Sequence, residues 1–163
     1  MGAGKTYWGK TWALQYDVPF IDLDEHIEKR TGRSIVQLFT EKGESGFRVI
    51  ETDILRSVNL LDPVLVACGG GTPLYHDNMT WMNRHGTTIF IREEADRLLE
   101  RLTGDTQKRP LFDQVDPADQ QQWIEESMRL RESCYARAAL VFNPTDPVSL
   151  SIIESKLAQY YSK

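Results

Sequence analysis

The sequence has few cysteines, no long apolar run and no excess of positive charge. Its two cysteines, Cys68 and Cys134, lie far apart and belong to no Cys-x-x-Cys or Cys/His cluster, which argues against a zinc site. No apolar run is long enough to span a membrane. The net charge of −5 argues against a nucleic-acid partner, because such proteins usually carry a basic excess. We therefore expect a cytoplasmic protein that binds neither membranes nor nucleic acids.

The chain of 163 residues, with 40% apolar and 26% charged residues, has the size and composition of one globular domain. Four short apolar runs, rich in β-branched and aromatic residues, alternate with segments of helical period. Such runs are typical of strands buried on both faces, as in a parallel sheet covered by helices. The runs are 18–21, 64–67, 87–91 and 139–142. The pattern predicts a three-layer α/β/α fold over residues 1–163.

The segments between these runs carry apolar residues three and four positions apart, as amphipathic helices do. Helices are predicted over 43–59, 94–103 and about 119–137, and from Pro147 onward. The segment 104–117 differs, because a glycine and two prolines interrupt its periodicity. We expect this segment to form a mobile loop.

Near the amino terminus, Gly2-Ala3-Gly4-Lys5-Thr6 matches the second half of a phosphate-binding loop of the Gly-x-x-x-x-Gly-Lys-Ser/Thr pattern. In this pattern backbone N–H groups surround the phosphates of ATP, the lysine reaches the outer phosphates and the hydroxyl binds Mg²⁺. A bare Gly-Lys-Thr also occurs by chance, but here a helix-compatible stretch follows directly. The first glycine of the pattern, and the strand that usually precedes it, would fall before the first residue. We therefore expect a vacant position in the middle of the sheet, and weak ATP binding by the chain as it stands.

Two further groups of residues lie at the carboxyl ends of predicted strands, where α/β sheets place their ligand crevice. Asp22 and Asp24 follow the first strand and, two residues apart, face the same way on an extended segment. An Asp24 that only caps the next helix is the simpler alternative, but it leaves Asp22 without a role. Gly69, Gly70 and Gly71 follow the second strand and allow a ligand to approach the backbone, although a plain turn would use them too. These features favour a P-loop phosphotransferase that acts on a small molecule.

Taken together, the motifs resemble those of the shikimate kinase family over essentially the whole chain. The matching segments are 2–6, 20–24, 46–51, 69–71 and 108–111, followed by Arg131 four residues before Tyr135. The resemblance implies phosphorylation of the shikimate 3-hydroxyl by ATP with Mg²⁺, on the way to chorismate and the aromatic amino acids. It also implies a monomer with a nucleoside-monophosphate-kinase-like fold and five parallel strands. A substrate-binding helical region is expected at about 24–60 and a lid at about 104–117.

The resemblance assigns substrate-binding roles to eight positions. Arg48 and Arg131 would hold the carboxylate of shikimate through charge-assisted hydrogen bonds, and Glu51 would orient Arg48. Asp24 would accept hydrogen bonds from ring hydroxyls and is the candidate to take the attacking proton. The remaining positions would wall the ring or position the acceptor: Phe39, Phe47, Gly70 and Gly71.

A second group of positions would bind ATP and Mg²⁺. Thr6 would bind Mg²⁺ directly, and Asp22 would support the ion through water. Lys5 and Arg109 would neutralise charge on the transferring phosphoryl group, which is the main task in phosphoryl transfer. The expected ATP-binding set is Gly2, Ala3, Gly4, Lys5, Thr6, Tyr7 and Arg109, and the expected catalytic set is Lys5, Asp24 and Arg109.

Some features depart from the family pattern. Tyr7 and Trp8 replace the small or aliphatic residues that usually follow the loop hydroxyl, and no arginine follows Asn143, where relatives often border the adenine. Two other functions therefore stay open: a gluconate-type sugar-acid kinase, and a catalytically impaired relative that binds a ligand or partner. The two carboxylate-binding arginines favour shikimate over gluconate. A start internal to the true gene would explain the missing strand without loss of function.

Overall fold

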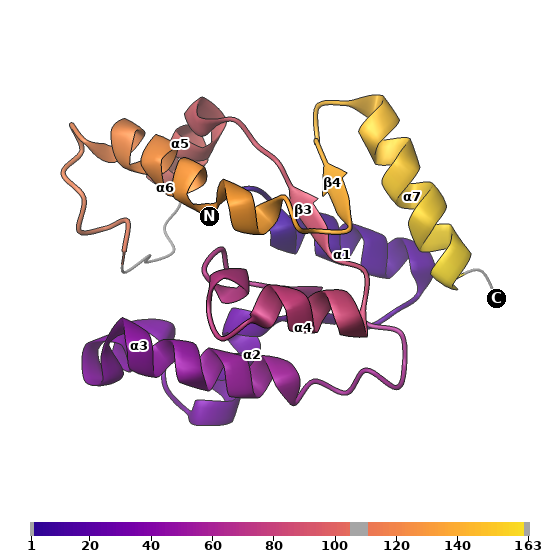
Figure 1. The fold of residues 1–163 in the computed structure, drawn as a ribbon, viewed down its shortest axis with the longest axis horizontal. Coiled ribbons are helices and arrows are strands. Elements are labelled where there is room, and N and C mark those ends of the chain that lie inside the picture. Colours follow the sequence, from indigo (N-terminus) through magenta and orange to yellow (C-terminus); the bar gives the residue numbers. More distant parts are fainter. Residues whose placement is uncertain (1, 105–110, 162–163) are drawn as a thin grey trace.

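The computed structural model describes residues 2–104 and 111–161 (Figure 1). The helices are α1 (Lys5–Tyr16), α2 (Leu23–Thr31), α3 (Ile35–Arg56), α4 (Asn78–His85), α5 (Ala95–Gly104), α6 (Gln120–Tyr135) and α7 (Pro147–Tyr161), with a 3₁₀ turn η1 (Thr72–Leu74). The strands are β1 (Phe20–Asp22), β2 (Leu65–Ala67), β3 (Ile89–Ile91) and β4 (Leu140–Phe142). Helices and strands alternate, which confirms the α/β class predicted from the sequence.

The four described strands form two separate parallel pairs. In the first pair Ile21 lies opposite Val66, and in the second Phe90 lies opposite Val141. A cavity of about 1180 Å³ lies between the pairs and is lined by residues of β2 and β3. Within the described residues the sheet is therefore interrupted at its centre, where the sequence predicts a vacant position. It is not the continuous five-stranded sheet of the family pattern.

Helix α3 extends further toward the amino terminus than the apolar periodicity predicted, although it lies within the helical region expected at about 24–60. Its N-cap is Ser34, whose hydroxyl accepts the N–H of Gln37 while the Gln37 side chain accepts the N–H of Ser34, as in a capping box. Gly43, with φ 65° and ψ 177°, kinks the helix. Because other side chains are strained at such a φ, glycine permits this change of direction. The predicted helix over 43–59 is the second half of α3.

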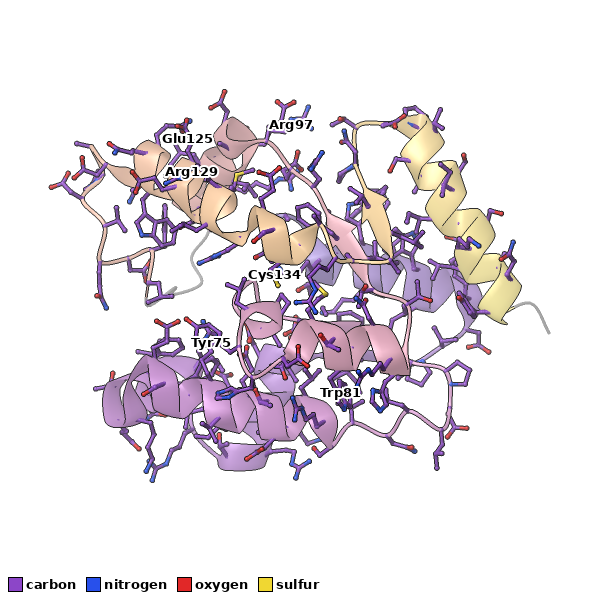
Figure 2. The ribbon with its side chains drawn as sticks, viewed as in Figure 1. Tyr75, Trp81, Arg97, Glu125, Arg129 and Cys134 are labelled. Carbon is purple, nitrogen blue, oxygen red and sulfur yellow. The ribbon has the colours of Figure 1, made fainter. Side chains whose placement is uncertain are left out.

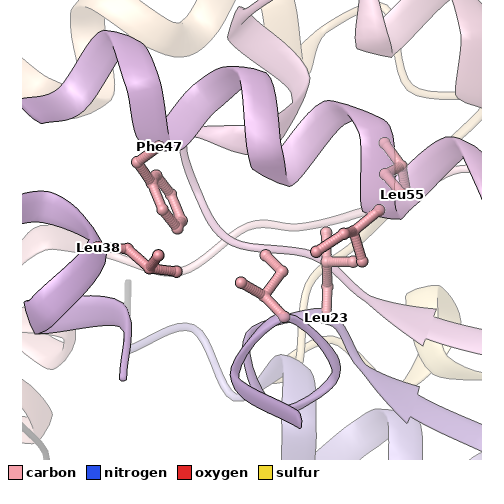
Figure 3. Close-up of a cluster of buried hydrophobic side chains, with 6 residues drawn as sticks. Leu23, Leu38, Phe47 and Leu55 are labelled. Atoms are coloured by element: carbon pink, nitrogen blue, oxygen red, sulfur yellow. The ribbon is translucent and has the colours of Figure 1, made fainter. Parts of the chain in front are cut away.

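A cluster of buried apolar side chains joins α2 to α3 (Figure 3). Its members are Leu23, Ile27, Leu38, Phe47, Ile54 and Leu55. Complete burial of one such side chain contributes about 1.5–3 kcal/mol to folding. Leu23 stands between Asp22 and Asp24, and Phe47 directly precedes Arg48. The buried cluster therefore fixes the backbone next to Asp22, Asp24 and Arg48, which the sequence predicts for the site.

Phe112 lies in the segment predicted as a lid, and its side chain is buried. It packs with residues of α5 and α6 and meets Trp123 edge-on. The later part of the segment is therefore anchored on these helices. Arg109 and the other residues of 105–110 lie outside the described residues.

Across the part of the chain that the structure describes, no helix combines the length and the apolar character needed to cross a membrane.

Candidate active site

The loop of residues 2–6 leads into the amino terminus of α1. Gly4 is the N-cap residue of this helix and has φ 82°, a left-handed conformation that favours glycine. The Trp8 N–H donates to the Gly4 carbonyl at 2.9 Å and closes the first turn. Amides in the first turn of a helix have no partner within it, and the helix dipole is positive at this end. The loop therefore offers the donors and the field that bind phosphate groups.

Thr6 on α1 and Asp22 at the end of β1 are in direct contact. The Thr6 hydroxyl donates a hydrogen bond to Asp22 Oδ2 at 2.8 Å. The other oxygen, Oδ1, accepts the Asp24 N–H at 3.1 Å and so caps α2. The capping role considered for Asp24 therefore belongs to Asp22, because Asp24 lies within the first turn of α2.

The chemistry of Thr6 and Asp22 is compatible with the Mg²⁺ site that the sequence predicts. Both side chains present the hard oxygen ligands that Mg²⁺ prefers. Proteins usually bind this ion through one or two side chains, while water and phosphates complete its coordination. Among the described residues, no group of three His, Cys, Asp or Glu side chains could hold a metal ion.

Arg48 is a buried cation on α3, with 5% of its surface exposed. Its Nη1 donates to Glu51 Oε2 at 2.9 Å, and its Nη2 donates to Glu44 Oε1 at 3.0 Å. Burial alone would lower the pKa of Arg48, but the charges of Glu51 and Glu44 outweigh this effect and raise it. Arg48 therefore remains charged. Its Nε is buried without a hydrogen-bond partner in the described part of the chain.

Three aromatic rings surround the Arg48 guanidinium. Its central carbon lies 5.7 Å from the ring centroid of Phe39, 5.1 Å from that of Phe47 and 4.8 Å from that of Tyr75. Contacts at these distances add cation–π attraction. The Tyr75 hydroxyl also donates to Glu44 Oε1 at 3.1 Å, which places Tyr75 beside α3 (Figure 2). Since Phe47 is only 2% exposed, it supports Arg48 from within the core.

The glycine triplet after β2 lies against α3. A Cβ atom on Gly71 would lie 2.3 Å from Arg48 Nη2, so a larger residue here would force the guanidinium to move. The next residue, Thr72, donates its hydroxyl to Glu51 Oε1 at 2.7 Å. Glu51 therefore links the glycine turn to Arg48 with its two carboxylate oxygens.

Tyr135, at the end of α6, connects Arg131 to the glycine triplet. Its hydroxyl donates to the Gly70 carbonyl at 2.5 Å. Burial raises the pKa of the Tyr135 phenol, whereas the positive charges of Arg131 and Arg48 act in the opposite direction. Both arginines therefore lie close enough to influence one phenol. Arg131 lines the same cavity as Gly69 and Gly70, while Arg48 lies against Gly71, so both predicted carboxylate-binding residues border the glycine triplet.

Cys68 lies where charges from the nucleotide and substrate groups converge. Desolvation raises the pKa of its thiol to about 12, with Glu51 and Asp24 adding to the rise and Lys5 opposing it. A Cβ atom on the neighbouring Gly69 would lie 3.3 Å from Glu51 Oε1 and 3.7 Å from Asp24 Oδ1. The predicted lysine and carboxylates therefore gather around the end of β2, where an α/β sheet is expected to bind its ligand.

Three residues that contact the site were not predicted as part of it: Glu44, Tyr75 and Tyr135. Glu44 precedes Arg48 by four positions, which is the spacing of a helical ion pair, so the sequence contains a signal for it. Tyr75 and Tyr135 reach the site from other elements. Tyr135 belongs to a motif that matches the family, at a fixed spacing from Arg131, whereas nothing in the sequence around Tyr75 indicates its contact.

Of two further predicted nucleotide-binding residues, the structure describes Tyr7 but not Arg109. Tyr7 is 67% exposed and packs edge-on against Trp8, with ring centroids 5.3 Å apart. Arg109 lies outside the described residues, so its role stays a prediction.

Comparison with known proteins identifies the family of this chain. Residues 1–160 match the family model described as shikimate kinase. The chain belongs to the shikimate kinase family. The shikimate kinase of Bacteroides thetaiotaomicron is 39% identical over 157 residues, which cover 96% of this chain and 90% of that protein.

Solved shikimate kinase structures share the fold of this chain. The structure from Bacteroides thetaiotaomicron aligns with a TM-score of 0.86 at 36% identity, covering 100% of this chain and 94% of that one. The shikimate kinase from Acinetobacter baumannii in complex with shikimate aligns with a TM-score of 0.84 at 28% identity, covering 99% and 89%. The interruption of the sheet therefore does not alter the overall arrangement of elements in this shikimate kinase family member.

Proposed function

We propose that this chain transfers the γ-phosphoryl group of ATP to the 3-hydroxyl of shikimate. The observation that carries the proposal is that Arg48 and Arg131 both border the glycine triplet after β2: Arg48 lies against Gly71, and Arg131 lines the same cavity as Gly69 and Gly70. Two guanidinium groups at one place suit a small carboxylate, because they form charge-assisted hydrogen bonds with it. The family match supports the same acceptor.

The substrate carboxylate would bind between Arg48 and Arg131. Glu51 holds Nη1 of Arg48 and thereby fixes the direction of its remaining donors. The buried Nε of Arg48 has no hydrogen-bond partner in the described structure, and a carboxylate would supply one. Because Arg48 is already buried and rigidly packed, little side-chain entropy is lost when the substrate binds.

Asp24 would position the attacking hydroxyl. Its Oδ1 lies beside the Gly69 backbone, at the same strand end as the two arginines. The hydroxyl oxygen attacks the γ-phosphorus, the bond from that phosphorus to the bridging oxygen of ADP breaks, and the hydroxyl proton passes to Asp24. Such transfers require mainly alignment and charge neutralisation.

Residues 2–6 would bind the phosphates of ATP. The loop amides and the amino terminus of α1 donate to phosphate oxygens, and Lys5 neutralises charge on the transferring group. Thr6 and Asp22 would hold Mg²⁺, which supplies further charge neutralisation when it is bound with ATP. Arg109 would add a second cation from the predicted lid. We further propose that the protein acts as a monomer in the cytoplasm.

A coupled assay of ADP release tests this function. Shikimate should support turnover that requires both ATP and Mg²⁺, while gluconate and nucleoside monophosphates should support little. Equal turnover on gluconate would favour a sugar-acid kinase instead. Tight shikimate binding without any ADP release would identify a catalytically impaired relative.

A further inference from the structure

Glu93 is a buried carboxylate outside the site described above. Glu93 is the second residue after β3, and only 5% of its surface is exposed. A carboxylate in such surroundings is costly unless a cation compensates it. The cations beside Glu93 therefore decide whether its burial is tolerated.

Two arginines of α5 face Glu93. Arg101 Nη2 lies 2.8 Å from Glu93 Oε2, in an orientation that gives a close ion pair without a well-aligned hydrogen bond. Arg97 Nη1 lies 3.8 Å from Glu93 Oε1. Arg97 and Arg101 are one turn apart on the same helix face. Arg101 is therefore the closer partner and Arg97 the looser one.

Arg101 also contacts the phosphate-binding loop. Its Nη1 donates a hydrogen bond to the Gly2 carbonyl at 3.0 Å. The same nitrogen lies 3.7 Å from the position of a Cβ atom on Gly4. Gly2 has φ 69°, so its backbone direction is one that few other residues adopt. One guanidinium therefore joins a buried carboxylate to the start of the loop.

We propose that Glu93 is a positioning residue for ATP, acting through Arg101 on the loop of residues 2–6. An exposed arginine samples many rotamers, but the fixed charge of Glu93 holds this one where Nη1 meets the Gly2 carbonyl. This hydrogen bond fixes the orientation of the peptide group that joins Gly2 to Ala3. It therefore also fixes the direction in which the Ala3 N–H points. The proposal rests on the nucleotide-binding role of the loop proposed above.

Glu93→Gln tests the proposal, because it removes the charge at nearly constant shape. The KM and the calorimetric Kd for MgATP should rise about ten- to a hundredfold, the effect of losing a hydrogen bond that involves a charged group. The KM for shikimate should stay within about twofold, since Glu93 touches none of its proposed ligands. A role in folding alone would lower the melting temperature and leave the two KM values in their wild-type ratio, which would overturn the proposal.

Arg101→Gln and Arg97→Gln complete the set. Arg101→Gln should reproduce the loss of ATP affinity, and the double variant should be no worse than either single one, because both act through one contact. Arg97→Gln is the matched control, since Arg97 faces Glu93 without reaching the loop, and it should bind ATP normally. Should Glu93→Gln fail to fold, Arg101→Gln decides alone, because Arg101 is largely exposed.

Lys5→Met separates this proposal from the proposed function. If Lys5→Met binds ATP as the wild type does, the loop is not the nucleotide site. If Lys5→Met loses ATP while Glu93→Gln and Arg101→Gln keep it, only the positioning role of Glu93 is wrong.

Discussion

The guanidinium of Arg48 fills the space that a side chain on Gly71 would need. A Cβ atom on Gly71 would lie 2.3 Å from Nη2 and 2.6 Å from Cζ of Arg48. Gly71 has φ −83° and ψ −26°, a conformation open to any residue, so the reason for a glycine here is the close approach of Arg48 and not the backbone conformation. The two residues therefore define the position of the proposed carboxylate site together.

Gly71→Ala should displace the Arg48 guanidinium from its contact with the turn after β2. Because the side chain would lose its alignment with Glu51, we expect the KM for shikimate to rise at least about tenfold, or about 1.4 kcal/mol. The KM for ATP should change little. Steady-state kinetics with each substrate varied in turn measures both values.

Gly86→Ala is the control for that substitution. A Cβ atom on Gly86 would have no neighbour within 4 Å, and its φ of −176° is ordinary extended backbone. If Gly71→Ala behaved like Gly86→Ala, the close packing of Arg48 on Gly71 would have no functional importance.

Arg131→Ala should weaken shikimate binding by about 2–5 kcal/mol, the range for truncating one partner of a buried charged pair. ATP affinity should stay near that of the wild type. Arg129→Ala, an exposed arginine on the same helix (Figure 2), is the control and should leave both affinities unchanged. Calorimetric titration of each ligand measures the effect. If Arg131→Ala lost ATP binding and kept shikimate binding, the assignment of Arg131 to the shikimate site would be wrong.

Much of the fold could be predicted from the sequence because its signals are local. The apolar runs locate all four described strands, and Pro147 marks the start of α7. The apolar periodicity missed the first half of α3, which only the family resemblance had included in a helical region, because the helix changes direction at Gly43. Helix α4 was missed because it is short and carries few apolar residues.

The site was predictable where its contacts are local or its motifs are specific. The pairing of Arg48 with Glu51 follows from their helical spacing. The contact of Thr6 with Asp22 joins two motifs that the sequence had already marked. The positions of Tyr75 and Tyr135 depend on how separate elements pack, so no pattern along the chain predicts them.

Asp22→Asn separates metal binding from helix capping at one residue. Asparagine caps helices about as well as aspartate, so the stability of α2 should be kept, but the negative charge is lost. We expect the Mg²⁺ concentration for half-maximal activity to rise at least about tenfold, while the melting temperature stays near the wild-type value. Asp22→Ala should additionally lose about 1 kcal/mol of stability. An unchanged Mg²⁺ requirement in both variants would exclude Asp22 from the metal site.

Stability above pH 9 should depend on Cys68. Its pKa is raised from an ordinary value of 9.0 to about 12, so the folded state keeps the thiol proton that the unfolded state releases. This contribution is complete below pH 9 and is lost as the pH rises toward about 12. Urea unfolding at several alkaline pH values should show a shallower decline for Cys68→Ala than for the wild type. Cys134→Ala, whose thiol shift is smaller, is the control, and equal slopes in all three proteins would contradict this prediction.

The recognition of the shikimate carboxylate by Arg48 and Arg131 is the central claim, and a cycle with an esterified substrate tests it most directly. The methyl ester of shikimate keeps the ring and its hydroxyls but carries no carboxylate charge. In the wild type, kcat/KM should fall at least about a hundredfold from shikimate to its ester, because charge-assisted hydrogen bonds are lost. In Arg131→Ala the same comparison should show a much smaller drop, because one partner is already absent. An equal drop in both proteins would contradict the account, since the carboxylate would then be recognised elsewhere.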